Sequence, residues 1–291
     1  MRGVIVEGRG GLYTVRDEAG QTYTLRAQKK FRRDDIKPLP GDRVVFTPRS
    51  GEEHGWLEQI EPRSSLCLRP PVANIERMVV VAAPEPLPDW LLIDKLLLFA
   101  RMQGIRPVLA INKSDLDQGQ LHQQMTRVYR GADAQVLRVS AHTGEGLEAL
   151  REAMRGGLSC LAGQSGVGKS ALLSSLLGID LVSGSISERI GRGRQTTRHT
   201  TLLYANGLQV LDTPGFSLLN IPSDLAPEDV PQYYPEFEGL GPCRFQPCLH
   251  LSEPGCQVRQ AVEAGDIDQS RMARYQELMA LVKEVWDARY K

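Results

Sequence analysis

The stretch from Gly163 to Ser170 constrains the fold most strongly, because it follows the pattern Gly, four residues, Gly, Lys and then Ser or Thr. A short apolar run at 157–162 precedes it, and the leucines of 170–177 fall on one side of a helix. Between a strand and a helix, glycines let backbone N–H groups wrap closely around phosphate. The motif therefore predicts a nucleoside triphosphate site, with Lys169 on the outer phosphates. The expected phosphate-site residues are Gly163, Gln164, Ser165, Gly166, Val167, Gly168, Lys169, Ser170 and Ala171.

A second polar segment, Asn112, Lys113, Ser114 and Asp115, follows the apolar run 107–111. Polar residues at the carboxyl end of a strand lie where open α/β sheets bind ligands. Asp115 can accept hydrogen bonds from guanine N1–H and the 2-amino group, whereas adenine would leave this carboxylate unpaired. The aliphatic part of Lys113 can cover the purine ring. Taken alone, the four residues could equally form an ordinary polar turn.

Two further loops carry chemistry that suits a guanine nucleotide. Asp212 follows the strand-like run 208–211 and can hold Mg²⁺, and the N–H of Gly215 can meet a γ-phosphate. Ser140 and Ala141 follow another strand-like run and can present a backbone N–H to guanine O6. Together with the two motifs above, these loops favour a GTP site over an isolated glycine-rich turn.

The polar stretch 191–199 lies between the phosphate loop and Asp212 and contains paired threonines. We expect the hydroxyl of Thr197 to complete a magnesium shell that Ser170 begins, when a γ-phosphate is present. Ser170 and Thr197 are therefore the predicted magnesium ligands.

The order of these motifs is unusual. In an ordinary small GTPase the phosphate loop comes first, whereas here the guanine-reading segments at 112–115 and 140–141 precede it. The sequence therefore predicts a circularly permuted domain, a rearrangement that is tolerated because domain termini often lie close together. As a consequence, the segment after Asp212 runs directly into the C-terminal part of the chain.

Length and composition limit the function classes. The chain has 291 residues, 41% of them apolar, which is enough for two or three domains with their own cores. The 35 Lys and Arg residues balance 35 Asp and Glu residues, so any contact with RNA must be local. The N-terminus lacks the apolar region of a signal peptide, and the most apolar helix, expected at 90–100, is too short to span a bilayer. We expect a cytoplasmic protein.

The first 65 residues predict a small β-barrel of the OB-fold type, because five short runs of β-forming residues alternate with polar or Gly-rich turns. The predicted strands are 4–7, 12–16, 22–25, 42–46 and 56–60. A basic segment around Phe31 is the best candidate for RNA contact, although from composition alone it could be a solvated loop. Its cations are Arg26, Lys29, Lys30, Arg32, Arg33 and Lys37.

A linker is expected at 63–74, and strands and helices alternate after it, which predicts a mainly parallel sheet covered on both faces. The predicted strands are 78–83, 107–111, 135–139, 157–162 and 208–211, and the predicted helices are 90–100, 116–131, 146–154 and 170–177. The predicted domains are 1–65 (OB-fold), 66–225 (permuted α/β P-loop GTPase) and 226–291 (mostly helical and zinc-binding).

The last domain contains Cys243, Cys248, His250 and Cys256, spaced C-x4-C-x-H-x5-C. Three thiolates and one imidazole can close a tetrahedral zinc shell, and a shell without an open position is structural. Clustered cysteines of this kind indicate a reducing compartment rather than a disulfide framework. After the cluster, Gly265 divides 258–290 into a short and a long helix, whose apolar stripe we interpret as packing rather than as a partner surface.

These motifs resemble the ribosome small-subunit-dependent GTPase A (RsgA) family of circularly permuted bacterial GTPases. The likeness spans nearly the whole chain, from Lys30-Phe31-Arg32 and Pro40-Gly41-Asp42, through Arg69-Pro70 and Ala73-Asn74-Ile75, to the Cys/His cluster. It implies a monomer that binds the small ribosomal subunit and its rRNA through the barrel, and that hydrolyses GTP to GDP and phosphate when the subunit stimulates it. The implied role is late maturation or quality control of that subunit, with GTP or GDP, magnesium and one structural zinc as cofactors.

Catalysis is the point at which this sequence departs from its relatives. Phe216 follows Gly215, where Ras-like enzymes have a water-orienting glutamine, so we expect slow hydrolysis by the free protein. Family members commonly carry a histidine before the threonine pair, whereas this chain has Gln195. We expect Gln195, Thr197 and Lys169 to carry catalysis. Two alternatives remain open: an RNA-binding scaffold that uses GTP structurally, and a GTPase that assembles the large subunit.

Overall fold

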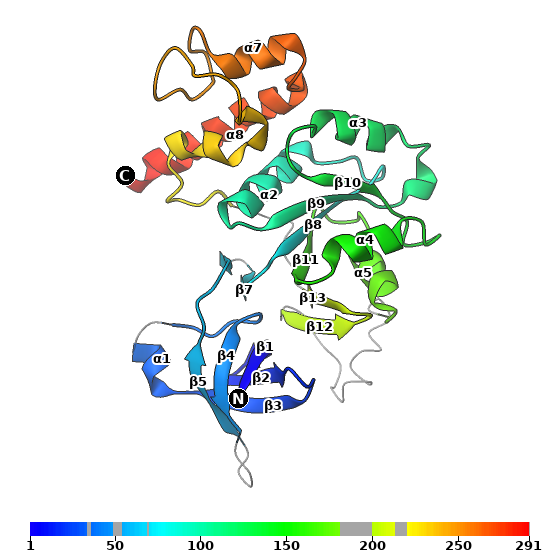
Figure 1. Ribbon diagram of the computed structural model, residues 1–291, viewed down its shortest axis with the longest axis vertical. Helices are drawn as coiled ribbons and strands as arrows, with labels where there is room; N and C mark the ends of the chain where they lie inside the picture. Colours follow the sequence, from blue (N-terminus) through cyan, green and yellow to red (C-terminus); the bar gives the residue numbers. More distant parts are fainter. Residues whose placement is uncertain (34–35, 49–53, 69, 181–199, 213–219, 291) are drawn as a thin grey trace.

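The computed structural model describes residues 1–33, 36–48, 54–68, 70–180, 200–212 and 220–290. Along the chain they form a barrel, a central α/β sheet and a group of C-terminal helices (Figure 1). In Figure 1 the barrel and the C-terminal helices lie at opposite ends of the molecule, with the central sheet between them. This order agrees with the predicted fold class.

The barrel closes because β1 pairs with both β2 and β4, in the strand order β1-β2-β3-β5-β4. All five predicted strands are confirmed. Alternate residues of each strand point inward, and Ile5, Val15, Leu25 and Phe46 are fully buried. The elements are β1 (Arg2–Arg9), β2 (Leu12–Asp17), β3 (Thr22–Ala27), α1 (Lys29–Arg33), β4 (Arg43–Thr47) and β5 (Gly55–Ile60).

The basic segment around α1 presents its charges rather than its ring to solvent. Phe31 is only 5% exposed and packs in the barrel core, so this aromatic side chain cannot stack on a base. Arg26, Lys29, Lys30, Arg33 and Lys37 are exposed. Any RNA contact of this segment is therefore electrostatic.

The central sheet has the strand order β10-β9-β8-β11-β13-β12. Its first five strands are parallel, as predicted, and β12 is an antiparallel edge strand that the sequence analysis missed. Asn206 and Gly207, both at positive φ, form the two-residue turn between β12 and β13, and this Asn-Gly pair is the signal that could have revealed the hairpin. The strands are β8 (Arg77–Ala82), β9 (Arg106–Ile111), β10 (Gln135–Arg138), β11 (Leu158–Ala162), β12 (Thr201–Ala205) and β13 (Leu208–Asp212).

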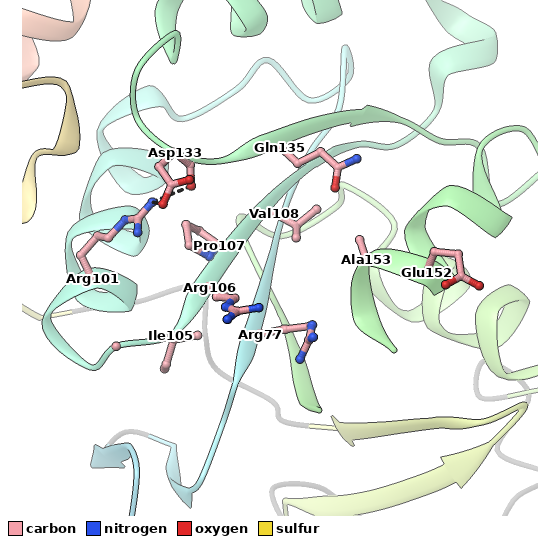
Figure 2. Close-up of a pocket in the computed structure, with 11 residues that line it drawn as sticks. Arg77, Arg101, Ile105, Arg106, Pro107, Val108, Asp133, Gln135, Glu152 and Ala153 are labelled. Carbon is pink, nitrogen blue, oxygen red and sulfur yellow. Dashed lines mark hydrogen bonds and ion pairs between the residues drawn. The ribbon is translucent and has the colours of Figure 1, made fainter. Parts of the chain in front are cut away.

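The carboxyl and amino ends of the parallel strands carry different groups. The predicted nucleotide motifs follow the carboxyl ends of β9, β10, β11 and β13, so the parallel strands bring them to one end of the sheet. A cavity of about 720 Å³ lies at the amino ends of β8 and β9. Figure 2 shows arginine side chains among the residues that line it.

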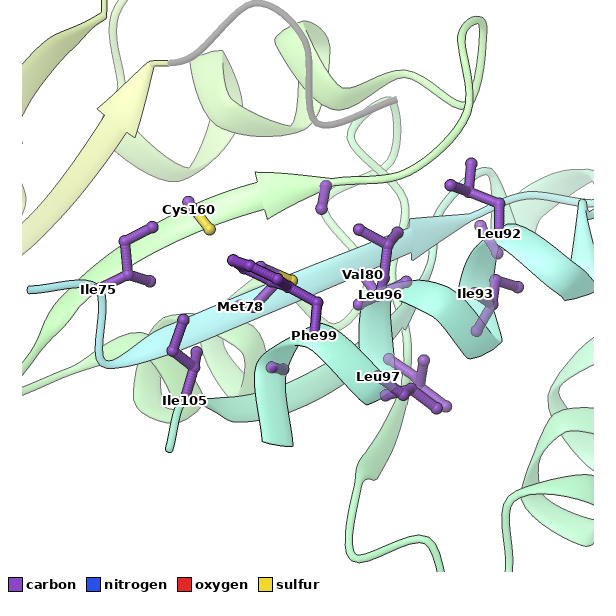
Figure 3. Packing of buried hydrophobic residues seen from close by; sticks show 14 of the residues in the cluster. Ile75, Met78, Val80, Leu92, Ile93, Leu96, Leu97, Phe99, Ile105 and Cys160 are labelled. Atoms are coloured by element: carbon purple, nitrogen blue, oxygen red, sulfur yellow. The ribbon is translucent and has the colours of Figure 1, made fainter. Parts of the chain in front are cut away.

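Helices cover both faces of the sheet and bury its apolar side chains. On one face, α2 packs Leu96 and Phe99 against Met78 and Val80 of β8 (Figure 3). The Asp89 carboxylate caps α2 by accepting from Leu92 N–H at 2.9 Å. The helices are α2 (Trp90–Met102) and α3 (Gln120–Val128) on this face, and α4 (Leu147–Met154) and α5 (Lys169–Leu177) on the other.

Helix α3 is shorter than the predicted 116–131. A single turn, η1 (Ser114–Leu116), comes first, and Asp117 then accepts from the N–H groups of Gln120 and Leu121. This carboxylate satisfies the free N–H groups of a helix start, so α3 begins after Gly119, which has a φ of 92°.

The described residues of the predicted linker, 63–68 and 70–74, include several buried side chains. The linker contains a two-stranded ribbon, β6 (Leu66–Leu68) and β7 (Pro71–Ala73), which the sequence analysis did not foresee. Asn74 is 3% exposed and donates to Gly41 O at 2.9 Å, and Arg63 pairs with the fully buried Asp42 at 2.8 Å. The connection therefore fastens the barrel to the central sheet.

The C-terminal helices form a separate core that also receives Leu98 of α2. Tyr275, Leu278 and Val282 of α8 are fully buried, which confirms the interpretation of the apolar stripe as packing. The elements are η2 (Pro227–Tyr233), η3 (Pro235–Phe237), α7 (Gln257–Ala264), α8 (Gln269–Asp287) and η4 (Ala288–Tyr290). Among the described helices, none is both long and apolar enough to cross a membrane.

Candidate nucleotide and metal sites

The phosphate loop joins β11 to α5, and its backbone needs glycine at several points. Gly163, Gly166 and Gly168 all have positive φ. A Cβ on Gly163 would lie 2.2 Å from the carbonyl oxygen of Val81, and one on Gly168 would lie 2.4 Å from Asn112 Nδ2. The loop can therefore pack against its neighbours only without side chains at these positions.

Lys169 folds over the loop that it follows. Its ammonium group donates to the carbonyl oxygens of Gly163 and Gln164, each at 2.7 Å. Burial lowers the pKa of Lys169, and both of these partners are neutral. A phosphate at this position would supply the negative charge that these contacts lack.

Gln164 ties the phosphate loop to the start of α2. Its side-chain oxygen accepts from Asp89 N–H at 2.7 Å, and its amide nitrogen donates to Leu87 O at 2.9 Å. The sequence analysis placed Gln164 in the phosphate site but missed this tether. No short motif reports it, because the bonded groups are far apart in the chain.

The predicted guanine-reading segment is bonded directly to the phosphate loop. Asn112 Nδ2 donates to Val167 O at 2.9 Å, and Lys113 Nζ donates to Gly166 O at 2.9 Å and to Glu85 O at 2.7 Å. Lys113 itself has a φ of 59°, which turns the chain sharply after β9. Two motifs more than fifty residues apart thus form one continuous set of loops.

Asp115 and Ser140 meet across this edge. The Ser140 hydroxyl donates a short hydrogen bond to the exposed Asp115 carboxylate and thereby lowers its pKa. The carboxylate is therefore kept ionised, which suits an acceptor for guanine N–H groups. The sequence analysis placed both residues in the site but did not foresee that they bond to each other.

Ala141 and Glu145 add contacts that the sequence did not reveal. Ala141 N–H donates to Asn112 Oδ1 at 3.1 Å, so in this structure the amide expected at guanine O6 is engaged by Asn112. Glu145 accepts from the Ser114 hydroxyl at 2.8 Å and lies 3.5 Å from Arg138. These bonds join the segment at 112–115 to the loop after β10.

The remaining predicted residues divide into two groups. Ser170 and Ala171 open α5 and are exposed, and Asp212 ends β13, also exposed, at the same edge. Gln195, Thr197, Gly215 and Phe216 lie outside the residues that the structure describes.

The Cys/His cluster gathers as the spacing predicted. The ligand atoms of Cys243, Cys248, His250 and Cys256 all lie within 4.8 Å of one another, and His250 Nδ1 is 3.3 Å from Cys256 Sγ. Tetrahedral zinc, with bonds of about 2.3 Å to sulfur and about 2.0 Å to nitrogen, places its ligands roughly 3.5–3.8 Å apart. The four residues therefore fit a closed zinc shell. Burial raises the pKa of Cys248 to about 12, so a metal must displace its proton.

The fold and these loops define a P-loop GTPase in which the guanine-reading segments precede the phosphate loop. The model of the RsgA GTPase domain matches residues 60–222, and the model of the RsgA N-terminal domain matches residues 2–57. The chain belongs to the RsgA GTPase family.

Relatives and solved structures agree with this assignment. The small ribosomal subunit biogenesis GTPase RsgA of Moorella thermoacetica is 42% identical, with 97% of each chain covered, and that of Caldanaerobacter subterraneus is 40% identical, with 100% of this chain and 99% of the relative covered. YjeQ from Thermotoga maritima superposes with a TM-score of 0.84 at 34% identity, covering 97% of this chain and 98% of that one. YloQ, described as a circularly permuted GTPase, gives 0.80 at 31% identity over 97% and 95% of the two chains.

Proposed function

We propose that this chain hydrolyses GTP to GDP and phosphate when it is bound to the small ribosomal subunit, and that it acts in late maturation or quality control of that subunit. The main support is the hydrogen bonds from Asn112 and Lys113 to the phosphate loop, because they join the predicted guanine-binding segment and the phosphate loop into one site. Relatives that share about 40% identity over the whole chain are named small ribosomal subunit biogenesis GTPases.

Guanine recognition rests on Asp115. Its carboxylate, held ionised by the Ser140 hydroxyl, accepts from N1–H and the 2-amino group of the base. The stem of Lys113 lies over the purine ring, while Asn112 keeps the base loop against the phosphate loop. A backbone N–H of Ser140 or Ala141 meets guanine O6, and in the case of Ala141 this amide must first be released or shared by Asn112.

The phosphates lie over the loop from Gly163 to Ala171, where Lys169 exchanges its neutral carbonyl partners for phosphate oxygens. Ser170 and Thr197 would hold Mg²⁺, Asp212 is a further carboxylate for the ion, and the N–H of Gly215 would bind the γ-phosphate. A bound magnesium ion would supply positive charge that stabilises the negative charge developing on the phosphates.

Hydrolysis requires a group that orients water, and Phe216 cannot supply one. We assign this role to Gln195, which both donates and accepts hydrogen bonds, and we expect Thr197 and Lys169 to take part in catalysis. Gln195→Ala should slow subunit-stimulated turnover while leaving GDP affinity unchanged, and Gln123→Ala on the exposed face of α3 is the matched control. If the Gln195 variant hydrolysed GTP as fast as the parent protein, the role would fall to another residue.

Cys243, Cys248, His250 and Cys256 hold one structural zinc, which supports the fold of the 226–291 domain. Metal analysis of the purified protein should find one zinc per chain, and Cys248→Ser should remove it. Cys160→Ala, in the core of the central sheet, should retain the zinc. A parent protein that folds fully without any metal would contradict this assignment.

The 1–65 barrel contacts rRNA through the exposed cations around α1, and the 226–291 domain receives the nucleotide state from the 66–225 GTPase domain through the segment that follows Asp212. Removing the chain after Ala226 should spare nucleotide binding and abolish stimulation by the subunit. Full stimulation of the truncated chain would exclude this route.

The decisive experiment is steady-state GTP hydrolysis by the purified protein, alone and with purified small subunits, using large subunits and ATP as controls. Stimulation by the small subunit alone, and for GTP alone, is the expected result. Stimulation by large subunits would favour a large-subunit assembly GTPase. Equal slow turnover in every mixture would favour an RNA-binding scaffold that uses GTP structurally. Sedimentation of the free protein should show a monomer.

A further inference from the structure

The cavity at the amino ends of the central strands is lined by two arginines that belong to no nucleotide motif. Arg77 begins β8 and Arg106 begins β9, and the two residues are direct partners in the parallel register. Their side chains therefore stand on the same face of the sheet, and Figure 2 shows both guanidinium groups beside each other at the cavity. Like charges in direct cross-strand contact are destabilising unless something offsets them.

The carboxylates around this cavity are already paired with other cations. Asp133 lies 2.8 Å from Arg101, and Glu152 lies 3.1 Å from Arg155. The backbone N–H of Arg106 donates to Glu76 O at 3.0 Å, but its guanidinium group makes no ion pair or hydrogen bond within the described part of the chain.

The carboxylate nearest to Arg77 is also shared. Glu76 lies 3.1 Å from Arg43 of the barrel, and its distance to Arg77 is 3.9 Å. The amino ends of β8 and β9 therefore carry a net positive charge at the Arg77–Arg106 pair.

The size and position of the cavity favour an extended anion. A guanidinium group binds phosphate through two parallel hydrogen bonds, and two adjacent guanidinium groups can enclose one phosphate. About 720 Å³ is more than one phosphate needs and lies in the range of pockets that hold whole small molecules, so a ribose and a base can enter with it. Arg43 on β4 continues the line of cations from Arg106 and Arg77 onto the barrel.

We propose that the Arg77–Arg106 pair binds a backbone phosphate of a single-stranded rRNA segment that continues from the barrel onto the GTPase domain. This inference rests on the proposed function, because it takes the RNA to be that of the small subunit. The cavity lies at the amino ends of the strands, whereas the phosphate loop follows the carboxyl end of β11. An anion in the cavity therefore does not occupy the site of the GTP phosphates.

The test measures the affinity of the GDP-bound protein for purified small subunits over a series of salt concentrations. Arg106→Gln and Arg77→Gln should each weaken binding about threefold to tenfold and reduce the slope of log K against log salt by about 0.7–1. Arg106→Lys should recover part of the affinity, because the charge remains while the two-pronged contact is lost. Arg259→Gln removes one exposed arginine from α7 and should behave as the parent protein does.

Basal GTP hydrolysis should be unchanged in all of these variants. An unchanged affinity and slope in the double variant Arg77→Gln/Arg106→Gln would overturn the proposal. An equal loss in Arg259→Gln would overturn it as well, because the effect would then be one of overall charge.

A second measurement does not depend on the ribosome. Phenylglyoxal modifies accessible arginines, and a short oligouridylate should protect Arg77 and Arg106 while inorganic phosphate at the same phosphate concentration should protect them little. Protection by inorganic phosphate but not by the oligonucleotide would assign the cavity to a small phosphorylated molecule, and no protection by either would reject the site. If the protein did not bind small subunits at all, the proposed function would fail, and this footprint would still decide whether the cavity binds RNA.

Discussion

Two polar clusters of this molecule hold their cations in opposite ways. In the nucleotide loops, Lys113 and Lys169 donate to the backbone carbonyl oxygens of Glu85, Gly163, Gln164 and Gly166. Between α2 and α8, Arg271 and Arg274 instead contact the Asp94 carboxylate, which is completely buried, at 2.8 and 2.7 Å. One cluster pairs its cations with dipoles, and the other pairs them with a full negative charge.

The pKa directions report this difference. Burial lowers the pKa of Lys169, whose partners are neutral. Burial alone would also lower the pKa of Arg271, but Asp94 and Glu236 raise it well above its usual value. Charge that only dipoles balance remains available for an incoming anion, whereas charge that a carboxylate balances holds two elements together. We therefore propose that the first cluster binds a ligand, whereas the ion pairs of the second join α2 to α8.

The largest effect is expected at the buried cluster. Asp94→Ala would leave the buried Arg271 and the half-buried Arg274 without their shared carboxylate. It would also remove the acceptor of the Tyr129 hydroxyl, which lies 2.7 Å away. Removing one partner of a buried ion pair costs about 3–5 kcal/mol of the free energy of unfolding. Urea unfolding measures this loss.

The matched control for Asp94 is Asp133→Ala. This carboxylate is 78% exposed and lies 2.8 Å from Arg101, so its loss should cost at most about 1 kcal/mol. Equal costs for the two variants would remove the distinction between the buried pair and the exposed one.

Lys169→Ala should strongly reduce GTP hydrolysis without unfolding the protein. Its partners are neutral backbone carbonyl oxygens in partly buried contacts, so the free energy of unfolding should change little. Subunit-stimulated hydrolysis should fall by a factor of about a hundred or more, which corresponds to about 2.7 kcal/mol of transition-state stabilisation. Single-turnover hydrolysis checks this result, with Lys283→Ala on α8 as control. Unchanged hydrolysis would contradict the proposal that the Lys169 ammonium group, whose partners are only carbonyl oxygens, binds the phosphates.

Asp115→Ala should weaken GDP binding by about tenfold to a hundredfold, because the hydrogen bonds from guanine to a charged acceptor are lost. Binding titrations with GDP measure this loss, and an unchanged affinity would exclude Asp115 as the guanine acceptor.

Ser140→Ala supplies a pH test. The Ser140 hydroxyl lowers the pKa of Asp115, so the ionised form persists to lower pH than in an ordinary aspartate. Without that hydroxyl, the pKa rises and the loss of GDP affinity on acidification moves to higher pH. Calorimetric titrations at several pH values would detect the shift, and an unmoved profile would exclude Asp115 as the titrating acceptor.

The smallest effect is expected for Gln164→Ala. This substitution removes two hydrogen bonds to the segment before α2, at Leu87 and Asp89, which are worth about 1 kcal/mol each at most in a partly exposed setting. GDP affinity should therefore fall only a few-fold. If Gln164→Ala lowered GTP hydrolysis as much as Lys169→Ala, the hydrogen bonds of Gln164, rather than the ammonium group of Lys169, would control the phosphate loop.

The sequence by itself determined the parts of this protein in which chemistry depends on short spacing. The phosphate loop, the segment from Asn112 to Asp115 and the Cys/His cluster each span fourteen residues or fewer, so their geometry follows largely from local backbone conformation. The order of the nucleotide motifs along the chain revealed the permutation. The alternation of apolar and polar residues predicted the barrel strands for the same reason.

Only the tertiary structure decided which distant groups meet. Asp94 and Arg271 are far apart in the chain, and nothing in their neighbourhoods distinguishes them from solvated charges until α2 and α8 pack together. Phe31 looked like a surface aromatic within a basic segment, yet the barrel interior takes it in. Arg77 and Arg106 become a pair through the register of β8 and β9. Such contacts depend on how whole elements are placed against one another, and a local pattern carries no information about that placement.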